Sequence, residues 1–91
     1  MEQSDRTKVA ILGAGRGGRA LLDLLHHIPS IEIVGVADRN PAAPGLQRAH
    51  ELQVPVTTSV PDLIGNHDVS LVLDVTGDPE METYLHAHKP P

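Results

Sequence analysis

The stretch Val9-Ala10-Ile11-Leu12-Gly13-Ala14-Gly15-Arg16-Gly17-Gly18 decides the fold of this chain. Its first four residues form the apolar run of a buried strand, and the leucine-rich segment after it has the periodicity of a helix. Between them the glycines at positions 13, 15 and 18 have the spacing Gly-x-Gly-x-x-Gly. In this context the first glycine allows a sharp turn, the second a close approach of phosphate to the backbone, and the third tight packing of helix on strand.

A second apolar run, residues 31–37, ends at Asp38, twenty positions after Gly18. A dinucleotide-binding unit places at this spacing the carboxylate that accepts hydrogen bonds from the adenosine ribose. The helix N-terminus offers N–H groups and partial positive charge to the pyrophosphate. The alternative is that Asp38 merely begins a turn with Asn40-Pro41. The sequence therefore predicts a dinucleotide site, with candidate residues Gly13, Gly15, Arg16, Gly17, Gly18, Asp38 and Arg39.

Apolar runs and helical periodicity alternate along the rest of the chain. Strands are expected over about 8–12, 32–37, 54–58 and 70–75, with helices over about 16–28, 44–52 and 79–88 and a short one capped by Ser59 that ends near Ile64. Pro55 lacks an N–H, which places the third strand at a sheet edge. Asp78-Pro79 has the pattern of a helix start. These elements predict an α/β fold: a three-layer, Rossmann-like (doubly wound) parallel sheet of about four strands in the order 3-2-1-4.

Composition narrows the classes of function. The chain has 91 residues, a formal net charge of −5 and no cysteine. A negative charge disfavours nucleic-acid binding, and the lack of cysteine excludes disulfides, thiolate metal sites and a cysteine nucleophile. No apolar run approaches the roughly 18 residues of a membrane span, so no membrane partner and a cytoplasmic location are expected.

Other polar residues give no catalytic or metal site. The six histidines are read as surface residues: His26 and His27 end a helix, and His86 and His88 are spaced for different helix faces. Asp74 interrupts an apolar strand and either bonds a neighbouring backbone group or hydroxyl or faces the crevice. Tyr84 is expected to pack. No Lys–His or Tyr–Lys pair is spaced as a dehydrogenase acid and base, so no catalytic residue is assigned and the isolated domain is not expected to be an enzyme.

Two arginines leave alternatives open. Arg16 lies in the glycine loop, where it either reaches a phosphate or faces solvent. Arg39 follows Asp38, where an arginine accommodates the 2′-phosphate of NADP or lies over the adenine. Because the Asp38 carboxylate would repel a 2′-phosphate, NAD is the expected cofactor and NADP the less favoured one.

Residues 8–85 resemble the cofactor domains of the glucose–fructose oxidoreductase and inositol dehydrogenase type. The shared stretches are residues 13–18, Val36-Ala37-Asp38-Arg39-Asn40-Pro41 and Val72-Leu73-Asp74-Val75-Thr76-Gly77. The resemblance implies pyrophosphate contacts at the three glycines, a ribose contact at Asp38, and a place near the cofactor for Thr76, with Gly77 beside it. Acylating acetaldehyde dehydrogenases have a similar opening, but nothing here corresponds to their catalytic cysteine.

A closer resemblance is to small Rossmann domains that precede PAS and histidine-kinase modules in bacterial signalling proteins. Residues 13–18, 75–79 and 89–91 fit their Gly-x-Gly-Arg-Gly-Gly, Val-Thr-Gly-Asp-Pro and Lys-Pro-Pro stretches. This implies a module that binds NAD(H) or an adenine nucleotide and reports its occupancy to an attached signal-transduction domain. The alternatives are the N-terminal cofactor-binding half of an NAD-dependent oxidoreductase and a Rossmann domain used only for assembly.

The 91 residues are expected to form one domain, with residues 89–91 beginning a linker to a downstream domain of a longer chain. A four-stranded fragment would leave the outer edge of the strand at Leu71–Val75 without a neighbour. Exposed edges of this kind tend to pair with another chain, which predicts a homodimer. The alternative is that the last helix covers this edge.

Overall fold

The structure, a computed structural model, describes residues 6–66 and 68–88, with one parallel sheet in the order β3-β2-β1-β4. The expected fold and strand order are therefore confirmed. The proposed linker at 89–91 and His67 lie outside the described residues. The elements in chain order are β1 (Thr7–Leu12), α1 (Arg16–His26), β2 (Ile31–Ala37), α2 (Pro44–Glu51), β3 (Val56–Thr57), α3 (Val60–Asn66), β4 (Leu71–Asp74) and α4 (Pro79–His88).

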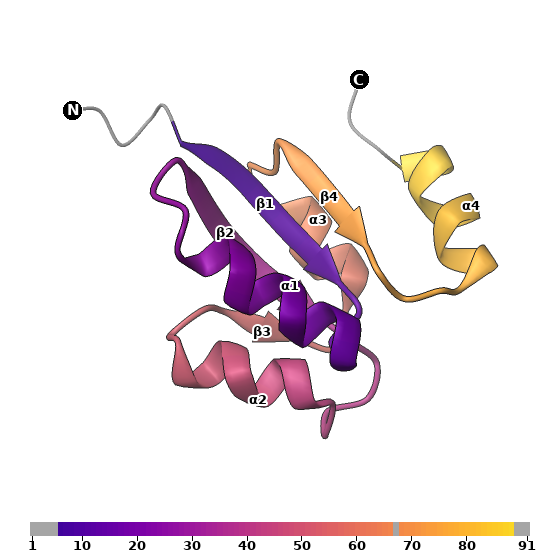
Figure 1. Cartoon of the computed structure of the whole chain (residues 1–91). Helices are drawn as coiled ribbons and strands as arrows, with labels where there is room; N and C mark the ends of the chain where they lie inside the picture. The colour runs from indigo at the N-terminus through magenta and orange to yellow at the C-terminus, as the bar shows by residue number, and fades with distance from the viewer. Residues whose placement is uncertain (1–5, 67, 89–91) are drawn as a thin grey trace.

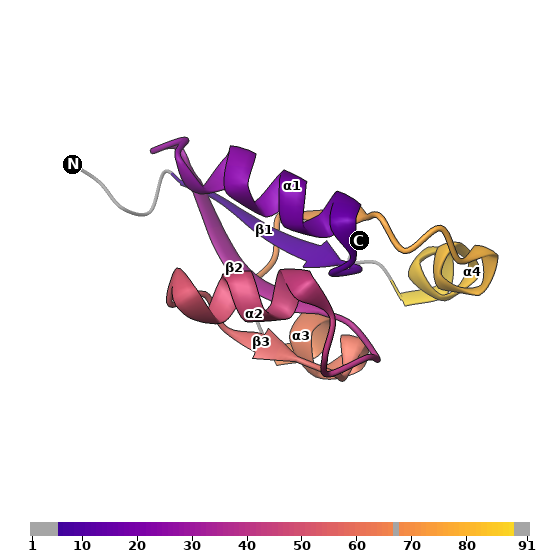
Figure 2. The ribbon, with the colours of Figure 1, turned by 60° about the horizontal axis from the view of Figure 1, so that its bottom comes forward.

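The sheet lies between two helical layers, each with its own apolar cluster (Figures 1 and 2). Successive β1 side chains alternate between the two clusters: Val9 and Ile11 pack with α1 and α2, and Ala10 and Leu12 pack on the side of α3. All four are fully buried, as expected for a central strand covered on both faces. Because all strand pairs are parallel, the carboxyl ends of the strands meet along one edge of the sheet, where the glycine loop follows β1.

Most predicted boundaries agree with the structure to within about two residues, and the differences have local causes. The third strand is shortened to Val56–Thr57, because Pro55 joins the sheet only through its carbonyl oxygen, which accepts from Val36 N at 3.0 Å. It lies at the sheet edge as predicted. Helix α3 continues to Asn66, two residues beyond its expected end near Ile64, so Gly65 is helical.

Strand β4 borders β1 on one side, and no other strand in the described part of the chain pairs with its outer edge. Leu71 and Val75 are 47% and 41% exposed there. Helix α4 lies beyond β4 in Figure 1 and buries Met81 against the α3 side of the core. The unpaired edge thus agrees with the prediction, while the homodimer stays a prediction. Within residues 6–66 and 68–88, the helices are too short or too polar to span a bilayer.

Candidate functional site

The first and third glycines of the loop are required by the fold itself. Gly13 has φ +100°, and a Cβ at this position would lie 2.9 Å from Thr76 N. Gly18 sits so close to the end of β1 that a Cβ there would overlap the carbonyl oxygen of Gly13. These two residues bring the start of α1 against the ends of β1 and β4, which forms the floor of the candidate site.

Gly15, in contrast, could carry a side chain without clashing with the rest of the protein. It is the N-cap of α1 with φ −74°, and an added Cβ would meet no atom within 4 Å. No side chain caps α1, and its first turn carries no acidic residue. The N–H groups of that turn are therefore open to an anion, and a Cβ at position 15 would lie in open space.

The Ala14 peptide is held from both sides. Asp38 Oδ2 accepts from Ala14 N at 2.7 Å, and its Oδ1 accepts from Asn40 N at 2.8 Å. Gly45 N donates to Ala14 O at 2.6 Å, and a Cβ on Gly45 would lie 2.7 Å from that oxygen. Asp38 thus fixes the glycine loop as well as facing the cleft. Gly45 was not among the predicted site residues, since its only signal in the sequence is its place at the start of a helix.

A cleft of about 320 Å³ opens at the carboxyl ends of β1, β2 and β4. Five of the nine predicted site residues line it: Gly13, Gly15, Asp38, Arg39 and Thr76. The unpredicted lining residues are Ala37, Val60, Val75, Asp78 and Met81.

The other four predicted residues do not line this cleft. Arg16 and Gly17 are exposed on the first turn of α1, and Gly18 is buried beneath the loop. Gly77 borders a different cavity. The binding roles assigned to all nine residues remain predictions.

The Thr76 hydroxyl is engaged within its own turn. It donates to Asp74 Oδ1 at 2.6 Å and accepts from Asp78 N at 3.1 Å, while Thr76 N also donates to Asp74 Oδ1. Asp74 thus bonds a neighbouring backbone group and hydroxyl, and it lines a separate cavity beside α4 rather than this cleft. Thr76 therefore shapes the cleft mainly through its backbone, which packs against Gly13.

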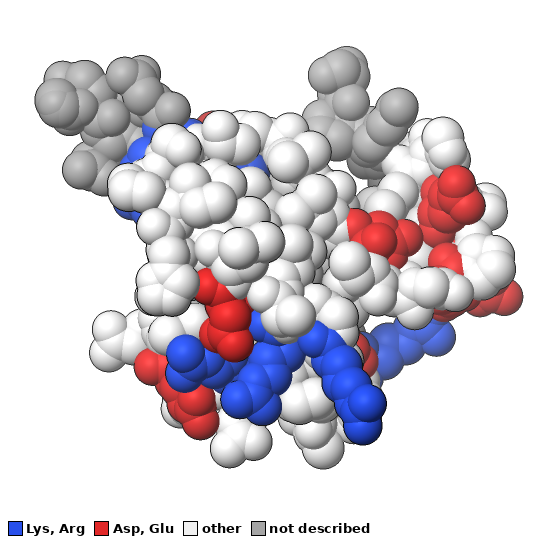
Figure 3. Space-filling view, viewed as in Figure 1, with Lys and Arg blue, Asp and Glu red and all other residues white. Residues whose placement is uncertain are grey.

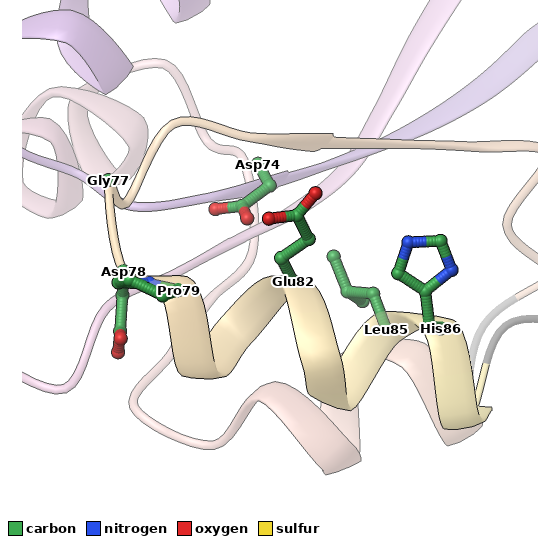
Figure 4. A pocket seen from close by; sticks show the side chains of 7 residues that line it. All are labelled: Asp74, Gly77, Asp78, Pro79, Glu82, Leu85 and His86. Atoms are coloured by element: carbon green, nitrogen blue, oxygen red, sulfur yellow. The ribbon is translucent and has the colours of Figure 1, made fainter.

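Two further cavities adjoin α4. One of about 460 Å³ continues from the cleft past Arg39, Val60 and Met81 to Glu80 and Tyr84. The other, of about 560 Å³, lies between β4 and α4, and Figure 4 shows the carboxylates of Asp74 and Glu82 pointing toward one another there. These acids make the second cavity unfavourable for a phosphate. Within the described ranges, no three His, Cys, Asp or Glu residues are grouped to hold a metal ion.

Charge is unevenly distributed around the site. Basic side chains gather over α1 and α2, and acidic ones gather over α4 (Figure 3). Arg48 in α2 donates from Nε to Asp23 Oδ1 in α1 at 2.7 Å, and this hydrogen bond lowers the pKa of Asp23 and raises that of Arg48. The pair links the two helices behind the glycine loop.

Comparison with known proteins places this geometry in a family. The family described as "Dihydrodipicolinate reductase, N-terminus" matches residues 7–88. The chain belongs to this family. Among curated relatives, acetaldehyde dehydrogenase from Chloroflexus aggregans is 37% identical over 76 residues, which cover 81% of this chain and 25% of the relative. Acetaldehyde dehydrogenase 7 from Rhodococcus jostii is 33% identical, with 77% of this chain and 29% of the relative covered.

The chain spans about a quarter of the length of these relatives. Among solved structures, the same fold occurs in GenD2 from gentamicin A biosynthesis, which was determined in complex with NAD. The two chains superpose with a TM-score of 0.79 and 23% sequence identity, over 96% of this chain and 25% of GenD2. The resemblance to cofactor domains of oxidoreductases is thus supported. The expectation of a signalling module attached to a PAS or histidine-kinase domain is wrong, because the family and its curated relatives are reductases and dehydrogenases.

Proposed function

We propose that this domain is the N-terminal, NAD-binding part of an NAD-dependent oxidoreductase. One observation carries the proposal: the open N-terminus of α1, the uncrowded Gly15 and the Asp38 carboxylate meet in a single cleft at the carboxyl ends of the strands. Parallel α/β sheets bind dinucleotides at this place, with the pyrophosphate at the helix N-terminus and the ribose at the acid. The NAD complex of a protein with this fold supports NAD over NADP as the cofactor.

Catalytic groups are proposed to come from sequence outside these 91 residues. The curated relatives are about four times as long as the stretch they share with this chain. The residues lining the cleft include two carboxylates, one arginine and one threonine but no lysine, histidine or tyrosine. These residues are suited to binding and orienting a cofactor. A further domain would supply the substrate-binding site and the catalytic acid and base.

Calorimetric titration of the 91-residue chain with NAD, NADH, NADP and ADP tests the proposal. We expect NAD to bind more tightly than NADP, with a Kd of about a micromolar or weaker because one domain contacts only part of the ligand. Asp38→Ala should weaken NAD binding and lower the ratio of the affinity for NAD to the affinity for NADP. Since Asp38 also holds the Ala14 peptide, the ratio of the two affinities is the decisive measurement. An absence of binding by all four ligands would refute the proposal.

A further inference from the structure

Arg39 and Asp78 join the two sides of the cleft. Arg39 follows the end of β2, and Asp78 precedes α4 at the far side of β4. Arg39 Nη2 lies 3.1 Å from Asp78 Oδ2, although 39 positions separate the two residues. Both residues line the cleft of the proposed NAD site, beside Asp38.

The local structure fixes Asp78 more firmly than Arg39. Asp78 Oδ1 caps α4 by accepting from Glu80 N at 2.9 Å, and Asp78 N donates to Thr76 Oγ1 at 3.1 Å. Its side chain is 32% exposed, against 73% for Arg39. Asp78 also lines the cavity that Asp74 and Glu82 share, and in Figure 4 its carboxylate is turned away from their carboxylates. Local hydrogen bonds therefore hold Asp78 in place, and its Oδ2 pairs with the more exposed guanidinium of Arg39.

Carboxylates outnumber the cation in this region. Asp38 and Asp78 line the cleft with Arg39, and Glu80 lines the adjoining cavity that Arg39 also borders. A guanidinium near the ribose is the group that would accommodate a 2′-phosphate. Here its charge is already opposed by Asp78, and a phosphate would also meet the two remaining acids.

We propose that Asp78 is a specificity-determining residue: by holding Arg39, it keeps the site selective for a ribose with a free 2′-hydroxyl against one with a 2′-phosphate. The inference rests on the proposed function and adds to it a residue from α4, outside the glycine loop and the acid at the end of β2. Asp78 acts through Arg39 and needs no contact with the cofactor.

The variant Asp78→Asn separates charge from structure, because asparagine caps helices about as well as aspartate. We expect the affinity for NADP relative to NAD to rise by about twofold to fivefold, the size that a partly exposed charge pair allows. In an Arg39→Ala background, the same change should give little or no rise. Glu82→Gln is the matched control: it removes the same charge from the same helix but faces the other cavity, so the ratio should stay at the wild-type value.

The readout is the pair of dissociation constants from calorimetry, with thermal denaturation of each variant to establish that it is folded. If wild-type protein binds NAD but Asp78→Asn leaves the ratio unchanged, the role of Asp78 is refuted and the proposed function stands. A rise that persists without Arg39, or that Glu82→Gln reproduces, also refutes it, because net charge alone would then explain the effect. If the wild-type chain binds neither dinucleotide, the proposed function itself fails.

Discussion

Replacing Gly15 with valine tests the cofactor site at a position where the fold itself does not require glycine. The backbone at this residue is open to valine, and the new Cβ meets no protein atom within 4 Å. The expected loss of stability is about 0.5–1 kcal/mol, since valine is a poorer N-cap than glycine. The domain should therefore remain folded.

The effect on binding should be far larger. The valine methyl groups would occupy the space through which a phosphate reaches the N–H groups of the first turn of α1. A hydrogen bond to a charged group contributes about 1.5–3 kcal/mol, so losing two of them raises Kd about a hundredfold or more.

Calorimetry with NAD on wild-type protein, Gly15→Val and Gly65→Val measures this effect. Gly65 is the control, because a Cβ there also meets nothing within 4 Å but lies in α3, away from the cleft. An unchanged Kd in a folded Gly15→Val protein would show that the pyrophosphate does not bind at this loop.

Three further outcomes follow from the same contacts. Gly18→Ala should lower the free energy of unfolding by about 3 kcal/mol or more, because its methyl group would collide with backbone. Gly17→Ala should raise the free energy of unfolding by about 0.5–1 kcal/mol, because its methyl group would meet no protein atom. Urea denaturation of both variants measures these changes. The Asp23–Arg48 pair should stabilise the folded state fully above the unfolded-state pKa of Asp23, and this stabilisation should be lost as pH falls through the lower folded-state pKa. NMR titration should find the pKa of Asp23 raised in Arg48→Gln, and an unchanged value would contradict the assignment. Light scattering should show a concentration-dependent dimer that Leu71→Lys weakens, and one monomer mass at all concentrations would contradict pairing through the β4 edge.

The sequence by itself determined the sheet, its strand order and the position of the glycine loop. Apolar runs, helical periodicity and the spacing from Gly18 to Asp38 are properties of contiguous residues, and parallel strands joined by right-handed crossovers leave few possible orders. The N-caps Ser59 and Asp78 were predictable for the same reason, and both accept the expected backbone hydrogen bond.

Tertiary structure alone decided how the site residues meet. The bond from Ala14 N to Asp38 spans 24 positions and the Arg39–Asp78 pair spans 39, so no local pattern reports either of them. The close approach of Gly45 to the Ala14 carbonyl depends on how α2 packs beside the loop. The Asp74 contact of the Thr76 hydroxyl, by contrast, spans only two positions, and the sequence already offered it as an alternative. Side-chain direction at the end of a strand is set by neighbours from other elements, and packing brings those neighbours together only in the folded chain.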